Sequence, residues 1–257
     1  MAAAFQNRVV FITGGAQGIG AGCAEAFCEA GGSVILFDRD EAQGRARAAT
    51  LSSSGPGQAF FHHGDVTDFP ALQRAIEQTV EDHGRLDCLI NNAGSHPPAT
   101  PIERTSIEMM EDLLRVNYLS TFAGCQFALP HLRKTQGSIV NISSMTAVLG
   151  QHHSTAYCAT KAAQVGLTKA LAIEAGPDQV RVNAILPSNV DTPLMRSWAA
   201  TLPNAAQALR QVSELQVLGR MATPREIGNI ALFLASDAAR FLTGLALEAD
   251  GGAALDY

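Results

Sequence analysis

The chain has 257 residues, 47% of them hydrophobic and 16% charged, which is enough for one hydrophobic core in a single α/β domain. Its net charge of −6 and its lack of lysine or arginine runs argue against nucleic acid as a partner. No apolar stretch has the length of a membrane span, and the first residues do not resemble a signal peptide, so we expect a cytosolic protein without a membrane partner. The five scattered cysteines have no metal-binding or redox spacing and are expected to be reduced.

Strand-like and helix-like segments alternate along the chain. Short apolar runs predict strands at residues 9–12, 33–37, 59–63, 86–90, 138–142, 181–186 and 245–248. Helices are predicted between them at residues 21–30, 41–53, 70–83, 106–115, 118–134, 155–175 and 224–236. This order predicts a doubly wound, seven-stranded parallel sheet with helices on both faces, in one domain spanning residues 1–257. Residues 187–220 are expected to be irregular, with a lid or substrate loop near residues 188–216.

A glycine-rich segment at residues 13–20 joins the first predicted strand to the first helix and reads TGGAQGIG. Such a turn lets the backbone approach a pyrophosphate, and the helix that follows offers free N–H groups at its positive end. Asp38 ends the next predicted strand, where an acid can accept hydrogen bonds from a ribose. The segment therefore predicts a dinucleotide site, with a plain tight turn as the alternative. The predicted contacts in it are Gly14, Gln17, Gly18, Ile19 and Gly20.

Other polar residues also fall where predicted strands end. Asp65, Asn91 and Ser144 each close a strand or follow one directly. Because ligands of doubly wound sheets bind beyond the carboxyl ends of the strands, these side chains are expected to meet at one cleft. Tyr157 and Lys161 are four residues apart in a predicted helix and therefore share one of its faces.

Together these motifs resemble the short-chain dehydrogenase/reductase family, and the resemblance covers nearly the whole chain. It rests on the glycine-rich segment, the NNAG sequence at residues 91–94, Asn117, Ser144 and the Tyr157-x-x-x-Lys161 pair, in that order. It implies a Rossmann fold and an alcohol dehydrogenase. A separate tight turn, a serine cap and a solvated Tyr/Lys helix face are the alternative interpretations of the individual motifs.

The chemistry assigns each catalytic candidate a role. Alcohol oxidation needs a base for the hydroxyl proton, and a nearby Lys161 ammonium favours the phenolate of Tyr157. Ser144 is expected to orient the reacting oxygen. The resemblance implies that Lys161 also holds the nicotinamide ribose and that Asn117 supports a proton-relay water.

NAD is the expected cofactor, because the Asp38 carboxylate would repel the 2′-phosphate of NADP. The glycine-rich segment has Ala16 and Gln17 where NADP-dependent relatives usually carry a basic residue. Arg39 is interpreted as a solvated side chain beside the adenine, with binding of a 2′-phosphate as the alternative. The resemblance implies further cofactor contacts at Asp65, Val66, Asn91, Ala93, Gly94, Ile185, Pro187, Val190 and Thr192. Ser188 stands where the family often has glycine, so the following loop is expected to take a different path.

The substrate is expected to be a secondary alcohol. Residues 91–98, Gly150-Gln151 and the tail ending in Tyr257 resemble family members that act on 17-beta-hydroxysteroids and are also described as acting on L-fucose. Residues 140–151 and 192–198 resemble bacterial members that act on L-fucose. The pocket candidates are His96, Met145, Gln151, His152, His153, Asn189, Leu194, Arg196, Trp198 and, in the tail, Tyr257. Their polarity favours a sugar lactol oxidised to a lactone, with a steroid as the alternative and a non-catalytic NAD sensor as the rival class.

No metal is expected, because His152 and His153 have no third ligand at suitable spacing. The resemblance also implies a homotetramer that forms through helices with small residues, such as the one predicted at residues 155–175.

Overall fold

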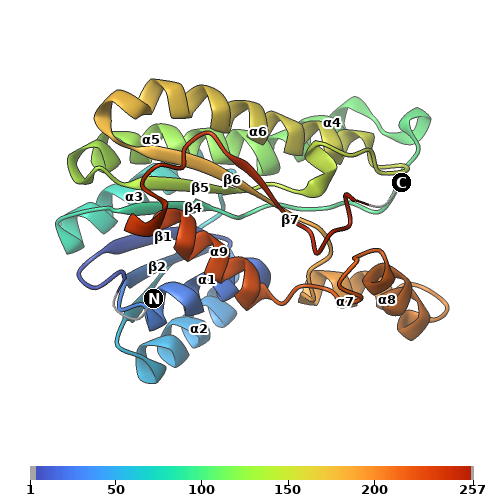
Figure 1. The fold of residues 1–257 in the computed structure, drawn as a ribbon, viewed down its shortest axis with the longest axis horizontal. Coiled ribbons are helices and arrows are strands. Elements are labelled where there is room, and N and C mark those ends of the chain that lie inside the picture. Colours follow the sequence, from blue (N-terminus) through green and yellow to red (C-terminus); the bar gives the residue numbers. More distant parts are fainter. Residues whose placement is uncertain (1–3, 256–257) are drawn as a thin grey trace.

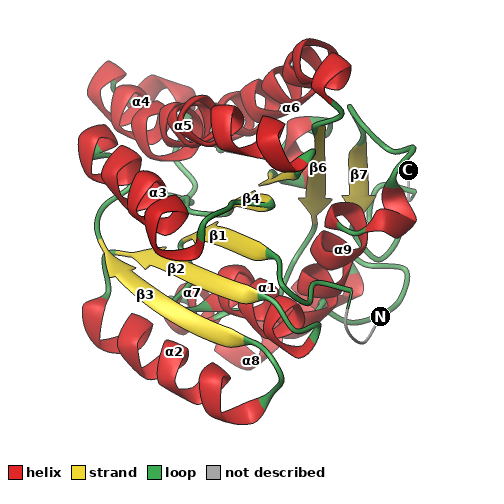
Figure 2. Ribbon diagram, turned by 90° about the vertical axis from the view of Figure 1, so that its left-hand side faces the viewer, coloured by secondary structure: helices red, strands yellow, loops and turns green. Residues whose placement is uncertain are grey.

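Seven parallel strands form one sheet in the computed structural model, which describes residues 4–255. The strands are β1 (Val9–Thr13), β2 (Ser33–Asp38), β3 (Gln58–His63), β4 (Cys88–Asn91), β5 (Ser138–Ile142), β6 (Arg181–Pro187) and β7 (Ala246–Ala249). Their order is β3-β2-β1-β4-β5-β6-β7, so the direction of winding reverses between β1 and β4 (Figure 2). This confirms the predicted doubly wound Rossmann fold and places its switch point at β1 and β4.

Helices cover both faces of the sheet (Figures 1 and 2). On one face lie α1 (Gly18–Glu29), α2 (Glu41–Ser54) and α9 (Pro224–Ala235). On the other lie α3 (Phe69–His83), α4 (Ile107–Leu114), α5 (Ser120–Thr135) and α6 (Thr155–Ala175). In β1, Val10 and Ile12 belong to the core beneath α1 and α9, whereas Val9 and Phe11 belong to the core beneath α3 and α5. This alternation follows from the two-residue period of a strand.

Two segments differ from the sequence predictions. Residues 187–220, expected to be irregular, contain α7 (Pro193–Ala200) and α8 (Ala205–Glu214), which project at the carboxyl edge of the sheet (Figure 1). Each begins at a capping side chain, because Thr192 accepts from the Met195 N–H at 3.2 Å and Asn204 from the Gln207 N–H at 3.0 Å. The prediction of an irregular region was therefore wrong.

The helices predicted at residues 106–115 and 118–134 are not separate. A π-helical turn over Arg115–Leu119 joins α4 to α5 without a break, and Asn117 lies within it. Such turns pair residues five apart and change the direction in which their carbonyl groups point. They occur frequently at functional sites.

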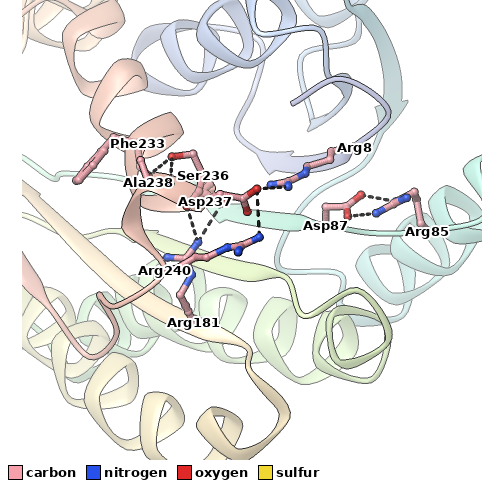
Figure 3. A network of polar contacts seen from close by, with 10 residues as sticks. Arg8, Arg85, Asp87, Arg181, Phe233, Ser236, Asp237, Ala238 and Arg240 are labelled. Carbon is pink, nitrogen blue, oxygen red and sulfur yellow. Dashed lines mark hydrogen bonds and ion pairs between the residues drawn. The ribbon is translucent and has the colours of Figure 1, made fainter. Parts of the chain in front are cut away.

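A polar network ties the opposite edge of the sheet, where the strands begin (Figure 3). The Arg181 guanidinium donates to carbonyls at the C-terminal end of α9, which have no partner within that helix. Asp237 accepts from Arg8 at 2.8 Å, and Arg85 pairs with Asp87 at 2.6 Å. These contacts fix the strand starts and leave the carboxyl edge to bind ligands.

All five cysteines are free, and four of them are buried. Burial raises the pKa of the Cys23, Cys28, Cys88 and Cys125 thiols to about 12, which leaves them protonated and unreactive. Within residues 4–255, no helix is long and apolar enough to cross a membrane.

Candidate active site

A cleft of about 820 Å³ opens at the carboxyl edge of the sheet. It is formed by the loops after β1, β2, β3 and β4, together with the end of β5, the start of α6 and the start of α7. The predicted residues that line it are Gly14, Gln17, Gly18, Ile19, Asp38, Arg39, Asp65, Val66, Ala93, Gly94, His96, His153, Tyr157, Lys161, Thr192 and Leu194. The fold therefore brings together residues that lie far apart in the chain.

The glycine-rich turn is held in shape from two sides. Gly14 has φ +65°, a conformation that favours glycine, and its N–H donates to the Phe37 carbonyl at 2.8 Å. The Asn92 amide donates to the carbonyls of Thr13 at 3.0 Å and Gly14 at 2.9 Å. Gly20 does not line the cleft, and a Cβ there would lie 2.0 Å from the Gly14 oxygen. Its role is to let α1 pack closely on the turn.

The Asp38 carboxylate is fixed by backbone donors. It accepts from the Ala16 N–H and the Asp40 N–H, each at 3.0 Å. Its oxygens keep further lone pairs that can accept from ligand hydroxyls. Arg39 is exposed, with its guanidinium 4.0 Å from the Asp65 carboxylate. The turn, the start of α1 and this carboxylate fit the phosphates and the adenosine ribose of a dinucleotide.

Lys161 is buried, and its ammonium donates to the Ile142 carbonyl at 3.0 Å and to Gln164 Oε1 at 3.2 Å. Burial lowers the pKa of Lys161 to about 8. Its Nζ lies 5.8 Å from the centre of the Tyr157 ring. Burial raises the pKa of Tyr157 to about 12, against the effect of a hydrogen bond from Ser144. The cleft thus presents a phenol proton donor beside a cation near neutral pH.

Asn117 and Ser144 also make structural contacts. The buried Asn117 amide accepts from the Ser95 N–H at 2.8 Å and donates to the Ser95 carbonyl at 3.0 Å. It thereby ties the loop after β4 to the π-helical turn, and it does not line the cleft. Ser144 caps a short turn by accepting from the Thr146 N–H at 3.2 Å, and it too lies outside the cleft lining.

His96 packs on the catalytic candidate, with 4.2 Å between the centres of the His96 and Tyr157 rings. Its Nδ1 lies 2.8 Å from the Pro97 carbonyl oxygen, which places a proton on Nδ1. Its Nε2 lies 3.3 Å from Gln151 Oε1. Gln151 therefore reaches the cleft through His96 rather than by lining it.

Five predicted cofactor contacts lie outside the cleft lining: Gly20, Asn91, Ile185, Pro187 and Val190. The sequence places Asn91 beside the cofactor, but its side chain is buried and its amide donates to Asn141 Oδ1 at 2.9 Å. Pro187 is buried at the end of β6. Val190 is buried in a bridge to Ala222. The neighbouring Asn92, which was not predicted as a site residue, supports the turn instead. The repeated asparagine of the NNAG sequence was the signal that could have indicated it.

Some of the predicted substrate residues line the cleft and others lie outside it. Asn189 lines a second cavity, where its amide donates to Gln216 Oε1 at 3.1 Å, because the loop after β6 turns toward α8. Trp198 is exposed on α7 and Met145 follows Ser144, both outside the cleft lining. His152 and Arg196 also lie outside it. Tyr257 lies outside the described residues. In residues 4–255, no three His, Cys, Asp or Glu side chains form a metal-binding group.

The fold and the cleft define a nicotinamide-dependent oxidoreductase. A family model described as enoyl-(acyl carrier protein) reductase matches residues 14–254. The chain is 45% identical over 253 residues to L-fucose dehydrogenase of Oryctolagus cuniculus, covering 98% of this chain and 87% of the relative. It is 37% identical to meso-2,3-butanediol dehydrogenase of Serratia marcescens, covering 97% and 95%. The chain belongs to the short-chain dehydrogenase/reductase family.

Solved structures agree with this assignment. The crystal structure of L-sorbose reductase from Gluconobacter frateurii, complexed with NADPH and L-sorbose, superposes with a TM-score of 0.94. The two proteins are 27% identical, and the match covers the whole of both chains.

Proposed function

We propose that the protein is an NAD-dependent dehydrogenase that oxidises a sugar lactol, such as L-fucose, to the lactone. The observation that carries this proposal is the placement of Tyr157 and Lys161 in a cleft that also holds the glycine-rich turn and Asp38. The similarity to L-fucose dehydrogenases supports the substrate.

Tyr157 exchanges the substrate proton. In oxidation its phenolate takes the proton of the reacting hydroxyl, and in reduction its phenol gives a proton to the carbonyl oxygen. The Lys161 charge stabilises the phenolate, because an opposite charge nearby favours the ionised form. Ser144 donates a hydrogen bond to the reacting oxygen and fixes its position. When bound, the nicotinamide supplies the hydride acceptor or donor.

Asp38 supports the choice of NAD. Its carboxylate is held by two backbone N–H groups, so it cannot turn away from a ligand at the end of β2 without losing them. A fixed anion accepts from the ribose hydroxyls of NAD and repels the 2′-phosphate of NADP. Arg39 could favour a phosphate, but its guanidinium lies 4.0 Å from the Asp65 carboxylate.

Polar groups around Tyr157 favour a sugar over a steroid. The His96 ring packs on the Tyr157 ring at an angle of 57°, and His153 and Ser154 line the same cleft. Thr100 and Ser95 add further polar groups to the same lining. A steroid would leave these groups without partners, at a cost in binding free energy.

A substrate panel tests the proposal. Initial rates are measured with L-fucose, other aldoses, 2,3-butanediol and a 17-beta-hydroxysteroid, each with NAD⁺ and with NADP⁺. We expect the highest kcat/KM for L-fucose with NAD⁺. A higher value for the steroid or the diol would overturn the sugar assignment, and equal rates with NADP⁺ would overturn the cofactor assignment.

The homotetramer and the cytosolic location rest on the family resemblance and the sequence, and both stay predictions. Mass measurement in solution tests the first, and fractionation of cells that make the protein tests the second.

A further inference from the structure

Gln164 lies three residues after Lys161 in α6 and is fully buried. Burying an amide costs free energy unless its polar atoms are hydrogen-bonded. Both the nitrogen and the oxygen of the Gln164 amide have partners. Gln164 Nε2 donates to the Asn117 carbonyl and to Thr121 Oγ1, each at 2.8 Å, and Oε1 accepts from Lys161 Nζ at 3.2 Å.

These contacts fix the orientation of the amide. The Asn117 carbonyl can only accept, and it also accepts from the Thr121 hydroxyl at 2.9 Å. Because the Thr121 hydroxyl proton is donated to this carbonyl, the Thr121 oxygen can only accept from Gln164. Both N–H groups of Gln164 are therefore committed to the π-helical turn and its neighbour, and Oε1 must face Lys161.

The Lys161 ammonium is fixed in turn. An ammonium has three N–H donors, and two of them go to the Ile142 carbonyl and to Gln164 Oε1. The third is left for the cleft that Lys161 lines. Gln164 is the side chain that connects Asn117 to Lys161, because the Asn117 amide itself bonds Ser95 and Thr160.

We propose that Gln164 is a positioning residue, which holds the Lys161 ammonium toward the cleft and stabilises its charged form. The inference rests on the proposed function, in which the Lys161 charge acts on Tyr157. An acceptor on an N–H of the ammonium favours the charged form, whereas burial disfavours it.

No charged side chain takes over this task in the described part of the chain. Burial alone accounts for the lowered pKa of Lys161. The elements packed around its Nζ present the Ile142 carbonyl and the Gln164 amide, and Tyr157 is the ionisable group near it. Cys158 is the further titratable group that acts on Tyr157, and it disfavours the phenolate.

The test is direct, because the chain contains three lysines: Lys134, Lys161 and Lys169. The full-length protein, without cofactor, is labelled with ¹³C at lysine Cε, and each lysine is titrated by NMR. Lys134 and Lys169 are exposed and serve as internal references, and Lys161→Arg assigns the third signal. Gln164→Leu should lower the pKa of Lys161 by about one to two pH units, the equivalent of one lost charged hydrogen bond.

Two further variants separate positioning from general destabilisation. Gln164→Glu should raise the pKa of Lys161, because it places an anion on the ammonium. Thr168→Val removes a buried hydroxyl of α6 that bonds Asn141 at 2.9 Å and does not touch Lys161, so it should leave the pKa unchanged. Should Gln164→Leu fail to fold, the direction of the Gln164→Glu shift decides the question alone.

A Lys161 pKa equal to the parent's in the folded Gln164 variants would overturn the inference, even in an active dehydrogenase. Opposite shifts in the Leu and Glu variants would support it. The titration needs no substrate, so it stays valid if the substrate panel refutes the proposed function. In active protein, the alkaline limb of the kcat profile should move to lower pH in Gln164→Leu, with KM for the alcohol unchanged.

Discussion

Replacing Asp38 by asparagine should weaken NAD use and relax the exclusion of NADP. The carboxylate accepts from the Ala16 and Asp40 N–H groups, and its remaining lone pairs face the cleft. An asparagine keeps one acceptor and turns an NH₂ donor toward a backbone donor. One charge-assisted hydrogen bond to the ribose contributes about 1.5–3 kcal/mol, so kcat/KM with NAD⁺ should fall about 10-fold to 100-fold.

The gain with NADP⁺ comes from lost repulsion. Two unit charges 4 Å apart interact by about 4 kcal/mol at an effective dielectric constant of 20, and Asp38 is partly exposed, so about half of that is a reasonable magnitude. The ratio of kcat/KM for NAD⁺ to that for NADP⁺ should therefore fall at least about 100-fold in total.

Initial rates with both cofactors and one alcohol measure the ratio. Arg39→Gln is the matched control, because it removes the neighbouring cation and keeps the carboxylate, and it should give no gain with NADP⁺. An Asp38→Asn protein that folds and keeps the parent's ratio would refute the assignment of Asp38 to the ribose.

Three further outcomes are expected. Carbonyl reduction needs a charged Lys161, so kcat/KM for the carbonyl product of the best alcohol should be level below about pH 8 and fall above it, as Lys161 loses its proton. The pH-rate curve measures this, and a profile level to pH 10 would contradict it. Gly20→Ala places a Cβ against the Gly14 carbonyl, so it should lower the free energy of unfolding by about 1–3 kcal/mol and abolish NAD binding. Denaturant unfolding measures the first effect and NADH fluorescence titration the second, and an unchanged NADH affinity would contradict the packing argument. His96→Ala should raise KM for the alcohol about 10-fold and leave KM for NAD⁺ unchanged, because the His96 ring covers Tyr157 and not the glycine-rich turn. Equal changes in both constants would contradict a position of His96 beside the substrate alone.

The sheet was predictable because its strands are continuous apolar runs, as in parallel sheets buried on both faces. The sequence also located the glycine-rich turn, Asp38, Tyr157 and Lys161, since each follows a strand or shares a helix face. What it could not supply were properties that depend on packing between distant elements. The π-helical turn at Asn117 has no distinct residue pattern, so it was predicted as a gap between two helices.

Residues near the site show the same limit. Asn91 and Asn92 are indistinguishable in sequence, and only the sheet decides that Asn91 is buried against Asn141 while Asn92 supports the turn. Gln164 belongs to no recognisable motif. Its role follows from hydrogen bonds to Asn117 and Thr121, in other segments, and to Lys161, one turn earlier in α6. The start of α7 had a sequence signal, because a capping Thr192 followed by Pro193 is typical of a helix N-terminus. This signal was not used when the region was predicted to be irregular.

In the proposed reaction Tyr157 exchanges a proton with the reacting oxygen. This role is tested by kcat of the Tyr157→Phe variant with L-fucose and NAD⁺, measured beside the affinity of the variant for NADH. We expect kcat to fall about 100-fold to 10,000-fold while the affinity stays within about threefold of the parent's. A folded variant that keeps the parent's kcat would contradict it.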